Sequence, residues 1–85
     1  MEKVKIVGTR AVQFMDQKDG RQVCGVSFYY TMHDDRVEGL MAGKLFVGEK
    51  KLVDLPYVPR PGQECWVDYD RYGKVSRFEL VQESK

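Results

Sequence analysis

Eighty-five residues provide for one small domain, and a formal net charge of +1 lacks the basic excess that most nucleic-acid-binding proteins have. Apolar residues make up 42% of the chain, but none of their runs approaches the ~20 residues that a membrane-spanning helix needs. The N-terminal residues lack the apolar core of a signal peptide, so we expect a cytoplasmic protein with a single domain over residues 1–85 and no membrane partner.

Five stretches with the composition of β-strands follow one another along the chain. The first covers about residues 4–14 and contains Gly8, where we expect a bulge or a bend. The Asp-Gly step at residues 19–20 predicts a hairpin turn. In the second stretch, residues 23–32, the even positions are apolar, and the odd positions are mostly polar but include Tyr29. This alternation predicts a strand of an antiparallel sheet with one buried face.

The middle of the chain is less regular. A third strand is expected over residues 37–47, and its internal glycines indicate strong coiling or a close backbone approach. Three prolines follow within residues 56–61, and they exclude a regular helix or a central strand there. Only residues 48–52 are compatible with a short helical turn, so a long connection separates the third strand from the fourth.

Two short strands complete the pattern, over residues 64–69 and 75–81. The turn at residues 71–74 joins them, with Gly73 supplying a positive φ, and residues 82–85 are expected to fray. This arrangement predicts an all-β fold, namely a five-stranded antiparallel OB-like barrel. A Greek-key sandwich and an SH3-like barrel have a similar number of strands and stay open as alternatives.

No catalytic pattern stands out in the sequence. The G-x-S-x-G, H-E-x-x-H and P-loop motifs are all missing, and His33 is the only histidine. His33 precedes two aspartates, so it either belongs to an acid–base pair or lies in a solvated loop. We expect no catalytic residue and no cofactor.

The remaining metal-ligand and redox candidates are four side chains. Asp68 and Asp70 lie two residues apart and either hold a metal or form surface ion pairs. Cys24 and Cys65 are far apart in strand-like sequence, where buried free thiols are expected and a disulfide is the alternative. Together with His33 the cysteines lack the close paired spacing of a zinc site, so we expect no bound metal.

The aromatic residues indicate a different kind of function. Tyr29 lies on the polar face of its strand, Phe46 shares a strand face with Lys44, and Tyr72 stands at the tip of the last turn. Exposed rings beside positive charge suit a single-stranded nucleic acid, because bases stack on rings while Lys and Arg contact the phosphates. The predicted nucleic-acid-binding residues are Arg10, Tyr29, Lys44, Phe46, Arg71, Tyr72, Lys74 and Arg77.

Each ring also has a structural interpretation. Tyr29 can form a cross-strand pair, Phe46 can belong to the core, and Tyr72 can cap its hairpin. Trp66 is either a core residue or a stacking platform. Each cation, taken alone, fits a solvated surface charge.

The distribution of charge sets one condition on this hypothesis. Residues 1–22 carry five basic and three acidic side chains, and residues 40–60 carry four and two, so each segment has an excess of +2. A basic face therefore requires that the fold bring the first strand and the middle segment together.

The C-terminal third combines a Pro61-Gly62 step, a strand over residues 65–69, the Tyr72-Gly73 turn and Leu80-Val81 near the end. In this it resembles the filamentous-phage helix-destabilising proteins, which are small OB-type proteins that coat single-stranded DNA as dimers. Through residues 37–40, 44–47 and 71–75 the chain also resembles small proteins of phages and conjugative elements in Gram-positive bacteria.

The resemblance implies a homodimer that binds single strands cooperatively in a bacterial or phage-infected cytoplasm, with Arg71, Tyr72 and Lys74 carried over as contacts. The near-neutral charge departs from it. We therefore expect a non-enzymatic, sequence-tolerant protein that binds single-stranded DNA, with RNA as the other nucleic acid open to it. The alternative is a small protein-interaction module with an apolar patch around residues 52–61 and no nucleic-acid binding.

Overall fold

The structure, a computed structural model, describes residues 2–18 and 20–81. The fraying predicted for residues 82–85 lies outside these ranges, as does Asp19 of the predicted hairpin turn. The described elements are, in chain order, β1 (Glu2–Met15), β2 (Gln22–His33), β3 (Leu40–Gly48), α1 (Glu49–Asp54), β4 (Glu64–Tyr69) and β5 (Val75–Leu80).

All five strands belong to one antiparallel sheet with the order β3-β2-β1-β4-β5. The predicted all-β, five-stranded antiparallel fold is therefore confirmed. β1 is the strand that joins the two halves: it pairs with β2 over most of its length and with β4 over Glu2–Lys5 only. Across the described residues no ladder joins β3 to β5, so the sheet is open and the closed barrel stays a prediction.

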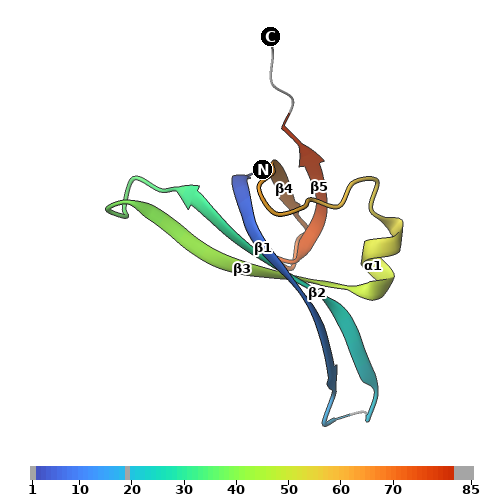
Figure 1. Cartoon of the computed structure of the whole chain (residues 1–85). Helices are drawn as coiled ribbons and strands as arrows, with labels where there is room; N and C mark the ends of the chain where they lie inside the picture. The colour runs from blue at the N-terminus through green and yellow to red at the C-terminus, as the bar shows by residue number, and fades with distance from the viewer. Residues whose placement is uncertain (1, 19, 82–85) are drawn as a thin grey trace.

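The β1–β2 hairpin extends away from the short β4–β5 hairpin, as Figure 1 shows. The molecule is accordingly elongated, with principal extents of 47 × 30 × 25 Å. In the turn of the long hairpin the Gly20 N–H donates to the Asp16 carbonyl at 2.8 Å, and Gly20 has a φ of 66°. This left-handed backbone is the conformation for which glycine is suited.

The expected irregularity of β1 is a bulge at Val7. The register with β2 shifts between Ile6, opposite Tyr30, and Gly8, opposite Tyr29. The extra residue reverses which side chains of β1 face the core: Ile6 is fully buried, whereas Arg10, four residues later, is exposed on the opposite face.

The core fills the concave side of the coiled sheet. Its two largest rings, Phe28 of β2 and Phe78 of β5, lie with their centroids 5.0 Å apart, so the core bridges the two halves of the sheet. The buried apolar residues are Val4, Ile6, Phe28, Val47, Cys65, Val67, Val75 and Phe78.

The connection between β3 and β4 is anchored to the core and to β1. The predicted helical turn at residues 48–52 is found as α1, and Leu52 and Leu55 pack against the core cluster. The Ile6 N–H donates to the Gln63 carbonyl at 2.9 Å, and the Gly62 N–H donates to the Ile6 carbonyl at 2.7 Å. These bonds satisfy backbone groups that a proline-rich segment cannot pair within itself.

β3 begins at Leu40, three residues later than predicted. The reason is a turn built on Asp34, whose Oδ1 accepts the Arg36 backbone N–H at 2.9 Å. Gly39 completes the turn with a φ of 88°, which no strand residue adopts. Residues 37–39 therefore belong to the connection between β2 and β3 and not to the strand.

Candidate nucleic-acid interface

Four of the predicted contact residues lie together on one face of the sheet. Tyr29 of β2 is directly opposite Lys44 of β3, and the next row across the sheet runs from Arg10 of β1 through Ser27 to Phe46. Side chains at directly opposite positions project from the same face. We call the side of β1–β2–β3 that faces away from the core cluster the outer face.

The fold brings the first strand and the middle segment together, as a basic face on this chain requires. β1 and β3 both pair with β2, so Arg10 and Lys44 come from separate segments onto the same surface. Both side chains are exposed, and neither has an acidic partner within ion-pair distance in the described part of the chain. Their charges are thus available to an external anion.

Phe46 is an exposed ring of this face. It is 41% exposed, so the interpretation of Phe46 as a core residue is wrong. The ring lies over Gly25 of β2, where a Cβ would come within 2.6 Å of the ring Cζ. Glycine at position 25 is therefore what allows the Phe46 ring to take this position against β2.

Phe14, near the end of β1, extends the aromatic surface. Its ring centroid is 6.3 Å from that of Phe46, in a tilted arrangement, and Phe14 is 49% exposed. The sequence reasoning missed Phe14, although the signal was present: Arg10, Val12 and Phe14 alternate along one strand and share a face.

Tyr29 is half-buried between its two neighbours on the outer face. On one side lies Gly8, where a Cβ would make only ordinary contacts with Tyr29, the nearest at 3.8 Å. On the other side lies Lys44. Tyr29 is thus both a cross-strand neighbour and a partly accessible ring, and the two interpretations are compatible.

Arg71, Tyr72 and Lys74 occupy the β4–β5 turn, apart from the outer face. Asp70 organises this turn: its Oδ1 accepts the backbone N–H of Tyr72 at 2.8 Å and that of Lys74 at 3.0 Å. Tyr72 is 77% exposed at the tip, as predicted. Of the three, only Lys74 borders a cavity that Phe46 also lines.

Arg77 does not join the other candidates. It lies on β5 opposite Asp68, and its Nε donates to Asp68 Oδ2 at 2.8 Å. The hydrogen bond to this carboxylate raises the pKa of Arg77. Asp68 thus forms a surface ion pair, one of the two roles predicted for it, and Arg77 has a structural partner.

Trp66 is half-buried on the face of β4 that points away from the core. Its direct neighbours in the sheet are Lys3 of β1 and Glu79 of β5. It belongs neither to the buried core cluster nor to the outer face of β1–β2–β3.

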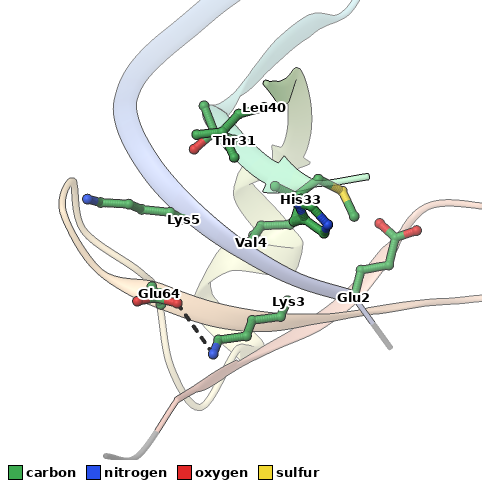
Figure 2. Close-up of a pocket in the computed structure, with 9 residues that line it drawn as sticks. Glu2, Lys3, Val4, Lys5, Thr31, His33, Leu40 and Glu64 are labelled. Carbon is green, nitrogen blue, oxygen red and sulfur yellow. Dashed lines mark ion pairs between the residues drawn. The ribbon is translucent and has the colours of Figure 1, made fainter. Parts of the chain in front are cut away.

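Another cavity, of about 610 Å³, lies between the start of β1 and the end of β2 (Figure 2). Its charged groups balance: Lys3 and Lys5 face Glu2 and Glu64, and Lys3 Nζ is 3.5 Å from Glu64 Oε2. A cavity with such compensated charge offers no net attraction to a polyanion.

His33 and the cysteines show no arrangement for catalysis. His33 Nε2 lies 2.9 Å from Asp35 Oδ1, and both side chains are almost fully exposed. Cys24 and Cys65 are free thiols, of which Cys65 is buried and Cys24 half-buried, so burial of both is only partly found. Over residues 2–18 and 20–81, no three His, Cys, Asp or Glu side chains gather as a metal site.

Comparison with protein-family models, with curated proteins and with solved structures finds no match. In the described part of the chain, no helix is long and apolar enough to cross a membrane. The function must therefore be argued from the outer face and its surroundings.

Proposed function

We propose that this chain binds single-stranded nucleic acid, DNA in the first place, on the outer face of β1–β2–β3 and catalyses no reaction. The observation that carries the proposal is the pair of adjacent rows that place Arg10, Tyr29, Lys44 and Phe46 on one surface. These two basic and two aromatic residues come from three different strands, and the strand pairing brings them onto the same face.

The chemistry of the surface favours unpaired bases. A ring that lies on a flat sheet can stack on a base only if the face of that base is free, which a duplex does not allow. Each such stack stabilises a complex by ~1–3 kcal/mol, and Arg and Lys add contacts to the phosphates. Stacking does not distinguish one base from another, so binding is expected to tolerate any sequence.

The near-neutral net charge is compatible with this proposal because the residues that share the outer face of β1–β2–β3 by strand pairing include no Asp or Glu. Asp34 is paired with Arg36 in the β2–β3 turn, Asp68 with Arg77 on β5, and Glu64 with Lys3. Arg10 and Lys44 have no such partner among the described residues. The local charge of the outer face is therefore more positive than the average of the chain.

The homodimer, cooperative binding and the bacterial or phage-infected cytoplasm also belong to the proposal, and they rest on the resemblance of residues 61–81 to the phage proteins. Sedimentation equilibrium of the free chain tests the dimer directly. A chain that stays monomeric at all concentrations up to about 100 μM, which is far above the dissociation constants of stable dimers, would contradict the homodimer.

The test of binding is fluorescence anisotropy with a labelled oligo-dT strand, first at about 20 mM salt and then at about 150 mM, because phosphate contacts weaken as salt rises. We expect binding to the single strand, weaker binding to a duplex of equal length, and a loss of affinity in Tyr29→Ala and Phe46→Ala. Val53→Ala, an exposed position on α1, is the control that should leave affinity unchanged. No binding of the wild type at low salt would overturn the proposal.

The alternative, a protein-interaction module, has one observation in its favour. Val53 and Val58 of the β3–β4 connection are 79% and 42% exposed, within the stretch 52–61 where an apolar patch was expected. The same titration separates the two functions, since a protein-interaction module has no salt-dependent affinity for oligo-dT.

A further inference from the structure

A cavity of about 520 Å³ lies between the end of β3 and the start of β5, two strands that do not pair in the described sheet. It begins at Phe46 and Val47, near the end of β3, and is bordered by Lys51 of α1 and by Asp70 and Lys74 of the β4–β5 turn. Figure 1 shows how α1 follows directly on β3 at this end of the sheet. The cavity is thus continuous with the outer face, because Phe46 belongs to both.

The cavity brings together two lysines that are far apart in the sequence. Lys51 and Lys74 are both exposed, and neither has an acidic side chain within ion-pair distance in the described ranges. The one carboxylate at the cavity, that of Asp70, uses Oδ1 to hold the backbone of the turn. Two cations against one engaged carboxylate leave the cavity with a positive charge.

We propose that this cavity is a phosphate subsite, in which Lys51 and Lys74 hold the backbone phosphate next to the base that stacks on Phe46. The inference rests on the proposed function and extends it: the strand leaves the outer face over Phe46 and passes through the opening between β3 and β5. The ligand is a phosphodiester of a single strand.

The position of Lys51 is what makes the subsite testable. Lys50 is its neighbour on the same short helix and carries the same charge, but it borders a different cavity together with Asp16 and Glu49. A general electrostatic attraction would depend on both lysines equally. A phosphate subsite in this cavity depends on Lys51 and not on Lys50.

The experiment measures the affinity of Lys51→Gln, Lys74→Gln and Lys50→Gln for labelled oligo-dT as a function of salt. Each phosphate contact contributes about 0.7 to the slope of log affinity against log salt for a single strand. Because both lysines hold the same phosphate, we expect Lys51→Gln and Lys74→Gln each to lower the magnitude of the slope by up to about 0.7, and the double variant to lower it by about 0.7 and not by twice that amount. Lys50→Gln should leave the slope at the wild-type value, and circular dichroism checks that each variant is folded.

The outcomes separate the two proposals. If wild type binds and Phe46→Ala weakens binding, but Lys51→Gln and Lys50→Gln have equal slopes, the subsite is overturned and the proposed function stands. If the wild type does not bind oligo-dT at low salt, both are overturned. If free inorganic phosphate at equal ionic strength displaces the wild-type complex no better than chloride, and Lys51→Gln still lowers the slope, the phosphodiester of the strand is the ligand.

Discussion

Phe28 of β2 and Phe46 of β3 project from opposite faces of the sheet, and their surroundings differ in almost every respect. Phe28 is 1% exposed and packs against Phe78 with a centroid distance of 5.0 Å. Phe46 is 41% exposed, lies over a glycine and has positive charge nearby. The comparison shows that the inner face of the sheet is packed into the core, whereas the outer face keeps exposed rings.

The sharpest way to break this comparison is to truncate both rings. Phe28→Ala leaves a cavity in the core and should lower the free energy of unfolding by about 3–5 kcal/mol, as measured by urea denaturation. Phe46→Ala should change it by less than about 1 kcal/mol, yet should weaken oligo-dT binding by ~1–3 kcal/mol. Equal losses of stability in the two variants would contradict the division between the faces.

The next test concerns Gly25 and Gly8, which lie next to the exposed ring of Phe46 and the half-buried ring of Tyr29. A Cβ at Gly25 would meet the Val47 carbonyl and the Phe46 ring too closely, so Gly25→Ala forces the strands or the ring to move. We expect a loss of about 1–3 kcal/mol in the free energy of unfolding. Gly8→Ala is the matched control, since its Cβ would make ordinary contacts with Tyr29 at 3.8 Å. A Gly8→Ala variant as unstable as Gly25→Ala would contradict the packing described for Phe46.

Arg10 and Arg77 allow the same test for charge. Arg10→Gln removes an unpaired cation from the outer face and should lower the salt slope of oligo-dT binding by about 0.7. Arg77→Gln removes a surface ion pair with Asp68, so it should leave the free energy of unfolding nearly unchanged and change the slope less than Arg10→Gln does. Anisotropy titrations over a series of salt concentrations check both. A larger slope change in Arg77→Gln would place the strand on β5 instead.

The smallest expected effect concerns the two cysteines at alkaline pH. Burial raises the pKa of the Cys65 thiol from 9.0 to about 11. The unfolded chain therefore releases this proton at a lower pH than the folded chain, and stability should fall as pH rises from about 9 to about 11. Urea denaturation at pH 8 and pH 10.5 should show a smaller decline in Cys65→Ala than in Cys24→Ala. Part of the decline should remain in both, because burial also raises the pKa of Tyr69, to about 12.

Local patterns in the sequence predicted much of the fold. The alternation in residues 23–32 defined both faces of β2, including the position of Tyr29, and Gly8 marked the bulge. Gly73 marked the last turn. These features depend on neighbours along the chain, where side-chain period and backbone conformation are readable from the residues themselves.

Features that depend on register between distant strands were not predictable in this way. That Asp68 stands opposite Arg77, and that Lys51 faces Lys74 across an opening, follows from strand pairing and from the course of the β3–β4 connection. The exposure of Phe46 follows from its pairing with Ser27 of β2, which places it on the outer face. A residue in a β-sheet obtains its role from partners that the linear sequence does not place.

The bulge at Val7 divides β1 into two parts whose even-numbered residues face opposite sides of the sheet. Before it, even-numbered residues such as Val4 and Ile6 point into the core, and after it the even-numbered Arg10, Val12 and Phe14 point to the outer face. One inserted residue thus acts as a phase shift between two alternations that would otherwise conflict. If β1 paired regularly through Val7, one half of the strand would have to turn over, so that either the core loses its valine and isoleucine or the outer face loses its arginine and phenylalanine. Deletion of Val7, in contrast, would leave Ile6 opposite Tyr30 and Gly8 opposite Tyr29 in a regular ladder, with both faces of β1 kept.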